Sequence, residues 1–138
     1  MSQLSSRTPL LSSPSSRIFA NPSLFWRTGV LFVAAGMTAG AFGTHALKAA
    51  GDFPPDRVEA FMTAAHYAIY NGLGLCIVSS HPRFGLHRFA GPAIAAGGFI
   101  FSLTIMAVVL SQGRLSGLAP VIPLGAMIAI AGYVCLAI

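Results

Sequence analysis

The chain has 138 residues, of which 55% are hydrophobic and only 8% are charged, and its mean hydropathy is +0.76. An ordinary soluble domain carries about 25% charged residues, so this sequence has too few to cover a water-exposed surface. The formal net charge of +5 comes from basic residues spread singly along the chain. Nucleic-acid binders cluster Lys and Arg to neutralise adjacent phosphates, so the composition argues against nucleic acid and indicates a lipid bilayer.

Residues 1–25 differ in composition from the rest of the chain. They are rich in serine, contain three prolines and two arginines, and lack acidic residues. Such a segment cannot bury enough apolar surface to fold, which predicts a disordered tail at 1–25 and a transmembrane domain at 26–138. A Ser- and Arg-rich tail without acids also resembles a mitochondrial presequence, so a mitochondrial inner membrane and other membranes both stay open as locations.

Four uncharged windows follow the tail, and each reaches the roughly 20 residues that a helix needs to cross a membrane. They predict transmembrane helices at about 28–47, 57–80, 89–111 and 118–138. The connections are short, which requires neighbouring helices to run antiparallel. The predicted fold class is therefore all-α, an integral membrane bundle of four antiparallel helices in up-down-up-down order.

The first connection contains several signals for helix ends. Gly51 fits the end of the first helix, and the pair Pro54-Pro55 forbids its continuation. Asp56, with Glu59 three residues later, resembles a capping box that would begin the second helix one residue after Asp56.

The fourth helix carries Pro120 and Pro123 near its start. Proline is tolerated in a first helical turn, where the backbone N–H groups lack partners anyway. If the helix began near Gly117 instead, the two prolines would bend it. The first-turn position is the favoured interpretation.

The basic residues also predict an orientation. With four helices, both termini share one side of the membrane. Three basic residues fall on the other side, and five fall on the side of the termini: Arg7, Arg17, Arg27, Arg83 and Arg88. Because basic residues favour the cytoplasmic side of a membrane, we expect both termini on the cytoplasmic or matrix side.

Small residues recur at four-residue spacing in the predicted helices. In lipid, such residues let helices approach closely, so we expect them at helix contacts: Gly36, Gly40, Gly43, Ala64, Ala68, Gly72 and Gly125. Tight packing within one chain is the favoured interpretation, and homodimerisation through Gly36 and Gly40 is the alternative.

The second helix carries a stripe of polar and aromatic side chains on one face: Thr63, His66, Tyr67, Tyr70 and Asn71. Polar side chains at this depth are expected to face the bundle interior or a wet cavity, and His45 approaches from the first helix. A structural hydrogen-bond network between the first two helices is favoured. A proton relay or substrate pathway and a metal or haem site on His45 and His66 are the alternatives. No carboxylate lies inside the membrane to support a metal, so no metal or cofactor is predicted.

The segment 40–48, GAFGTHALK, resembles the signature of domain-of-unknown-function family 423, which includes the transmembrane protein 256-like proteins. Phe101-Ser102 is similar to the pattern of the family's third helix, and Leu118-Ala119-Pro120 to the start of its fourth. This resemblance implies a four-helix membrane protein and adds Ser102 to the polar candidates. It supplies no activity or cofactor.

Some positions depart from the family pattern. Asn71 stands where histidine is usual, Ile122 where threonine is usual, and Met106 and Tyr133 where tyrosine and tryptophan are usual. No Ser-His-Asp arrangement, phosphate loop or paired carboxylate is present, so no catalytic residue is predicted. We expect a non-enzymatic structural or partner-binding membrane component; a small transporter or proton-coupled factor is the alternative.

Overall fold

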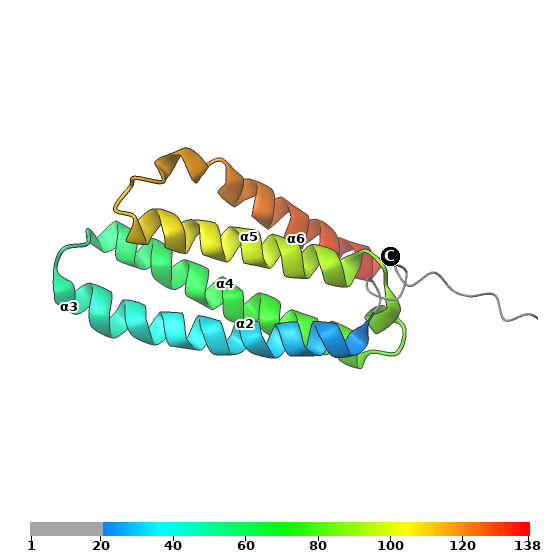
Figure 1. Cartoon of the computed structure of the whole chain (residues 1–138). Helices are drawn as coiled ribbons and strands as arrows, with labels where there is room; N and C mark the ends of the chain where they lie inside the picture. The colour runs from blue at the N-terminus through cyan, green and yellow to red at the C-terminus, as the bar shows by residue number, and fades with distance from the viewer. Residues whose placement is uncertain (1–20) are drawn as a thin grey trace, which may run out of the picture.

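The computed structural model describes residues 21–138, and this part of the chain is helical without strands. Four long helices run back and forth along one direction (Figure 1), and both ends of the described chain lie at the same end of the molecule. Each is long and apolar enough to cross a membrane, the last one when the preceding turn from Ser116 is included, which confirms the predicted all-α membrane fold. The helices are α2 (Pro22–Phe42), which continues through η1 (Gly43–Leu47) and α3 (Lys48–Ala50), then α4 (Pro55–Ser80), α5 (Ala90–Leu110) and α6 (Val121–Ala137).

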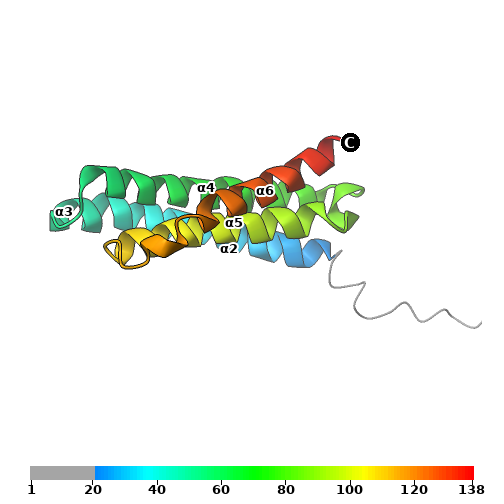
Figure 2. The same ribbon diagram turned by 90° about the horizontal axis from the view of Figure 1, so that it is seen from above.

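The four helices form an open row rather than a closed square. α4 and α5 pack on each other in the middle, α2 packs on α4 and α6 packs on α5, whereas α2 and α6 share no substantial contact. Figure 2 shows α6 crossing the central pair at an angle. Consequently 44% and 39% of the residues in the most apolar stretches of α4 and α5 are buried, against 17% in those of α2 and α6.

The first helix begins earlier than the sequence predicted. The Asn21 side chain accepts hydrogen bonds from the backbone N–H groups of Ser23 at 3.1 Å and Leu24 at 3.4 Å, and Pro22 occupies the first helical position. This is a strong N-cap arrangement. Residues 22–25 therefore belong to α2 rather than to the tail, and the predicted disorder of residues 1–20 lies outside the described residues.

The connection before α4 confirms one sequence signal and corrects another. Gly51 ends the first helix with a φ of +69°, a left-handed conformation that glycine adopts readily. Pro54 is the N-cap of α4 and no side chain caps it, so the predicted capping box is wrong. Pro55 has the fixed φ of a first helical residue, so the helix starts there, and Asp56 lies in its first turn beside the positive end of the helix dipole.

The start of α6 agrees with the favoured interpretation of its prolines. Pro120 is the N-cap and Pro123 is the third helical residue, so both fall where a missing N–H breaks no intrahelical hydrogen bond. The short 3-10 turn η3 (Ser116–Leu118) precedes them.

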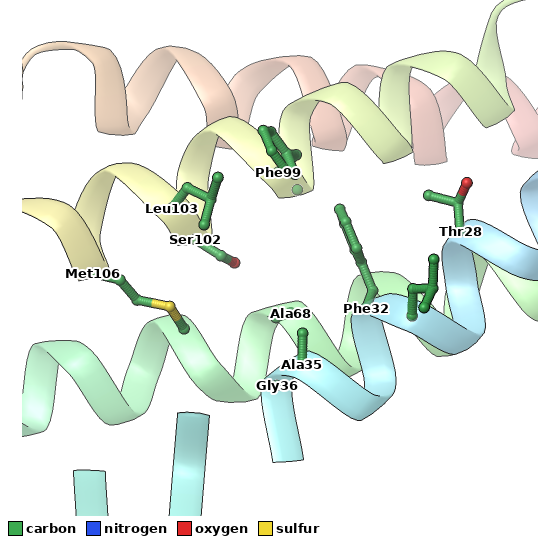
Figure 3. Close-up of a pocket in the computed structure, with 11 residues that line it drawn as sticks. Thr28, Phe32, Ala35, Gly36, Ala68, Phe99, Ser102, Leu103 and Met106 are labelled. Carbon is green, nitrogen blue, oxygen red and sulfur yellow. The ribbon is translucent and has the colours of Figure 1, made fainter. Parts of the chain in front are cut away.

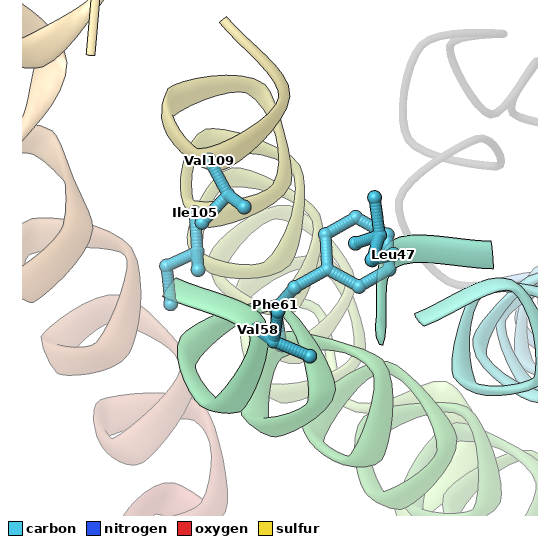
Figure 4. Packing of buried hydrophobic residues seen from close by; sticks show 6 residues of the cluster. Leu47, Val58, Phe61, Ile105 and Val109 are labelled. Atoms are coloured by element: carbon cyan, nitrogen blue, oxygen red, sulfur yellow. The ribbon is translucent and has the colours of Figure 1, made fainter. Parts of the chain in front are cut away.

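Large side chains fill the junction between the two central helices, where Leu47 and Phe25 of the first helix join them. One cluster lies near the connection between α3 and α4 (Figure 4) and consists of Leu47, Val58, Phe61, Ala64, Ile105 and Val109. A second cluster lies toward the opposite end and consists of Phe25, Leu75, Val78 and Ile94. Leu75 and Ile94 are fully buried, so α4 and α5 form the packed centre of the molecule.

The outer helices instead approach the central pair backbone to backbone. A Cβ atom at Gly29 of α2 would lie 2.6 Å from the carbonyl oxygen of Gly72 in α4, and one at Gly125 of α6 would lie 2.7 Å from the backbone nitrogen of Phe101 in α5. Only glycine permits such contact. In lipid this close packing takes the place of a hydrophobic driving force between helices.

The packing face of the first helix differs from the expected four-residue repeat. Gly36 and Gly43 are buried, whereas Gly40 is half-buried, and a Cβ there would only touch the Cβ of Ala65 at 4.0 Å. The buried glycines at 29, 36 and 43 repeat every seven residues, as expected for a helix that stays against one partner over several turns. Homodimerisation through Gly36 and Gly40 is therefore not supported, because Gly36 faces Ala65 and Ile69 of the same chain.

Candidate functional site

The structure places most of the polar stripe of α4 on the outside of the molecule. Thr63, His66, Tyr67 and Tyr70 are exposed, with Tyr70 at 60%, and only Asn71 is buried. Thr63 and Tyr67 each line a cavity between helices, so the expectation that the stripe faces the interior or a wet cavity is corrected for His66 and Tyr70.

The physical reason lies in the opposite side of the same helix. Ala64, Ala68 and Gly72 are buried there, and their small size lets the neighbouring helices approach. Because this side of α4 faces the neighbouring helices, the side half a turn away, which carries His66 and Tyr70, faces outward.

The exposed aromatic side chains of the stripe pack on one another. The rings of His66 and Tyr70 are stacked with centroids 6.4 Å apart, and Tyr67 meets Tyr70 edge-on at 5.9 Å. Tyr67 also meets Phe101 of α5 edge-on at 5.2 Å. Edge-on and offset contacts of this kind are favourable arrangements for aromatic rings. The stripe is therefore a continuous aromatic surface on α4 that includes a histidine.

Asn71 forms the main polar connection between helices in the described chain. Its Nδ2 donates to the backbone oxygen of Tyr67 at 2.9 Å, and its Oδ1 accepts from the hydroxyl of Tyr133 in α6 at 3.3 Å. Within residues 21–138, the side-chain hydrogen bonds between the first helix and α4 involve sulfur: Thr44 Oγ1 donates to Met62 Sδ at 3.6 Å, and Cys76 Sγ donates to the backbone oxygen of Trp26 at 3.9 Å. The polar stripe is instead linked to α6 through Asn71. The site prediction missed Tyr133, although a lone hydroxyl in the apolar helix α6 needs a partner in lipid.

His45 lies apart from this link. It is exposed on η1, a π-helical turn that the sequence analysis did not predict. Beside it, the hydroxyl of Thr44 donates to the backbone oxygen of Gly40 at 2.9 Å. Among residues 21–138, no three His, Cys, Asp or Glu side chains come together as a metal site would require.

The cavities between the helices of the described chain include the following four. Two lie within the row, a groove of about 390 Å³ between α2 and α5, and a pocket of about 280 Å³ around Asn71 and Tyr133. The other two lie at the end of the molecule near the connection before α4, one beside Arg57 and one beside Lys48. None of these four includes His45 or His66, so they offer no path to either imidazole.

Ser102 lies in the groove between α2 and α5. It is 5% exposed, and its hydroxyl has no hydrogen-bond partner within the described residues. It therefore takes no part in the link between Asn71 and Tyr133.

Comparisons with known proteins agree with this architecture. Residues 39–126 match the family described as "Protein of unknown function (DUF423)". A UPF0382 membrane protein of Schizosaccharomyces pombe is 31% identical over 114 residues, which cover 78% of this chain and 93% of the relative. A UPF0382 membrane protein of Staphylococcus haemolyticus is 30% identical over 118 residues, which cover 83% and 93%. No solved structure matches the chain.

Proposed function

Because the chain belongs to the DUF423 family, whose curated relatives are named membrane proteins, we propose that it is a non-enzymatic membrane component that binds another membrane protein through α4. The observation that carries this proposal is the exposure of His66. At 1.5 Å per residue, His66 lies roughly 16 Å from the start of a helix roughly 39 Å long. It therefore sits deep in the bilayer and faces outward.

A polar side chain at that depth is costly when it faces lipid, and such residues usually pair with protein groups. The imidazole of His66 can both donate and accept a hydrogen bond, and the exposed hydroxyls of Thr63 and Tyr70 flank it on the same face. A transmembrane helix with polar side chains at matching depth would satisfy these groups. The partner is therefore a membrane protein rather than a soluble one.

The short connections support the absence of an enzymatic role. The long helices are joined by three short segments, residues 51–54, 81–89 and 111–120. Segments of this length offer few residues from which to build an active site outside the membrane. The exposed position of the histidines likewise favours binding over a relay.

Photocrosslinking in native membranes tests the partner surface. A photoreactive phenylalanine analogue is placed at Tyr70, on the polar face, or at Met37, which is 63% exposed on α2. We expect a discrete protein adduct from position 70 and only lipid adducts from position 37. An adduct of twice the chain mass would identify the partner as a second copy, whereas lipid adducts alone from position 70 would contradict the proposal.

We also propose that both termini lie on the cytoplasmic or matrix side. The basic residues within 21–138 divide evenly between the two ends of the molecule, and Arg27, Arg83 and Arg88 lie at the end that carries the termini. The excess of positive charge on the side of the termini therefore comes from Arg7 and Arg17. Topology reporters at residue 52 and at the C-terminus should report opposite sides of the membrane. Reversal of both signals after Arg7 and Arg17 are replaced by Gln would support this charge rule, whereas a C-terminal reporter on the outer side of the unchanged chain would overturn it.

A further inference from the structure

The groove between α2 and α5 passes over Ala68, on the buried side of α4, in the apolar part of the molecule. Its volume is about 390 Å³ and its lining is almost wholly apolar. Figure 3 shows Thr28 at one end and Met106 toward the other, with Phe32 of α2 and Phe99 of α5 between them. Gly36 and Ala68 lie where α2 meets α4. The groove exists because α2 and α5 both pack on α4 but scarcely touch each other.

Ser102 places a hydroxyl group in this apolar groove. Its Oγ is the one buried side-chain polar atom among residues 21–138 that lacks a hydrogen-bond partner, and Figure 3 shows it directed away from α5 into the groove. Other helical hydroxyls in the chain, such as those of Thr38 and Thr44, donate to the backbone oxygen four residues earlier. An unpaired buried polar group is unfavourable, so a ligand that accepts a hydrogen bond from Ser102 would be stabilised by pairing with it.

The depth of Ser102 restricts the chemistry of such a ligand. The residue lies roughly 18 Å from the start of α5 and roughly 12 Å from its end, near the middle of a hydrocarbon core about 30 Å thick. A phospholipid keeps its polar groups at the membrane surface and presents only hydrocarbon here. The acceptor must belong to a molecule that dissolves within the core, and a carbonyl oxygen is such an acceptor.

Two aromatic rings beside Ser102 indicate the shape of the ligand. Phe32 and Phe99 are nearly parallel, with centroids 6.2 Å apart and an interplanar angle of 17°. Phe99 is three residues before Ser102 and so lies one turn away on the same side of α5. Aromatic faces favour offset stacking with flat rings, so the groove offers a flat surface beside a hydrogen-bond donor.

We propose that this groove binds a flat, membrane-dissolved carbonyl compound of the quinone class, with the Ser102 hydroxyl donating to a ring carbonyl. The ring lies against Phe32 and Phe99, and the apolar tail leaves the groove toward the lipid. The site is independent of the α4 partner surface, because Ser102 and His66 belong to different helices and His66 does not line the groove.

Titration of the full chain in detergent with a decyl-substituted benzoquinone tests this site. We expect saturable stabilisation against heat, and we expect Ser102→Ala to weaken the affinity roughly tenfold, the effect of losing one hydrogen bond. Ser80→Ala is the matched control, because that exposed hydroxyl is already paired with the backbone oxygen of Cys76 at 2.8 Å. Decylbenzene, which has the ring and tail without the carbonyls, should bind the unchanged chain as weakly as the quinone binds Ser102→Ala.

Two further outcomes would overturn the proposal. Equal binding of decylbenzene and the quinone to the unchanged chain would show that the groove takes any apolar chain. A lower melting temperature of ligand-free Ser102→Ala would show that the hydroxyl stabilises the fold itself. We expect that temperature to stay the same or to rise, because the substitution removes an unpaired polar group.

Discussion

The outer and central helix junctions of this molecule are built in different ways. Where α2 meets α4 and α6 meets α5, glycines such as Gly29 and Gly97 let the backbones touch. Where α4 meets α5, large side chains such as Leu75, Val78 and Ile94 fill the space. The outer helices remain mostly exposed while the central pair is well buried.

This difference predicts opposite sensitivities to substitution. A junction that depends on backbone contact tolerates no added atom, whereas one that depends on large side chains is harmed by losing atoms. Lipid tails are as apolar as leucine, so close contact rather than water exclusion holds the helices together in both cases. The predictions below follow this contrast from the largest expected effect to the smallest.

Gly97→Leu should detach α6 from α5. A Cβ atom at position 97 would overlap the backbone nitrogen of Ala129 and lie 2.7 Å from the carbonyl oxygen of Gly125, and neither backbone atom can move aside. We expect a large loss of thermal stability in detergent and faster maleimide labelling of Cys135, which is half-buried on α6. Ala96→Leu is the control on the exposed neighbouring position, and equal behaviour of the two variants would contradict backbone contact.

Gly36→Leu should separate α2 from α4, whereas Gly40→Leu should be tolerated. At position 36 a Cβ would lie 2.8 Å from the carbonyl oxygen of Ala65, while at position 40 it would make only ordinary contact. We expect a clear fall in detergent melting temperature for the first variant and little change for the second. The opposite order would restore the four-residue repeat as the contact face.

Leu75→Ala tests the central junction by removing atoms. Leu75 is fully buried between α4 and α5, so truncation leaves a cavity and should lower the free energy of unfolding by about 2 kcal/mol. Unfolding by SDS in mixed micelles measures this change. Leu73→Ala on the exposed face of the same helix should have little effect, and a similar loss there would show that both faces are packed.

Tyr133→Phe should have the smallest effect. It removes only the hydroxyl that donates to Asn71 across α6 and α4, and hydrogen bonds between membrane helices average about 0.6 kcal/mol. The same SDS unfolding measurement applies, with Tyr70→Phe on the outward face as the control. A loss several times larger would mean that this bond, rather than glycine contact, holds α6 in place.

Local signals in the sequence predicted much of the fold. The length of the uncharged windows predicted four spanning helices, and Gly51, Pro120 and Pro123 indicated helix ends that the structure confirms. The start of α4 was misjudged because Pro55 and Asp56 both favour a helix start, and the sequence alone does not decide between them.

The site was less predictable, because helical periodicity shows which residues share a face but not what covers that face. The stripe around His66 was correctly grouped by spacing, yet its outward direction depends on where α2 and α5 pack against α4. Similarly, the four-residue spacing of Gly36 and Gly40 predicted that both contact a neighbouring helix. Only the path of α2 over α4 shows that Gly36 packs closely and Gly40 does not.

The sequence by itself determined that this chain belongs in a membrane and crosses it with four helices, because hydropathy and the length of a helical span are properties of each segment alone. Only the tertiary structure decided that the helices form an open row, that Asn71 pairs with Tyr133, and that the Ser102 hydroxyl is buried without a partner among residues 21–138. These features depend on distances between helices far apart in the chain. In lipid those distances are set by the fit of small and large side chains, because no exclusion of water drives helices together.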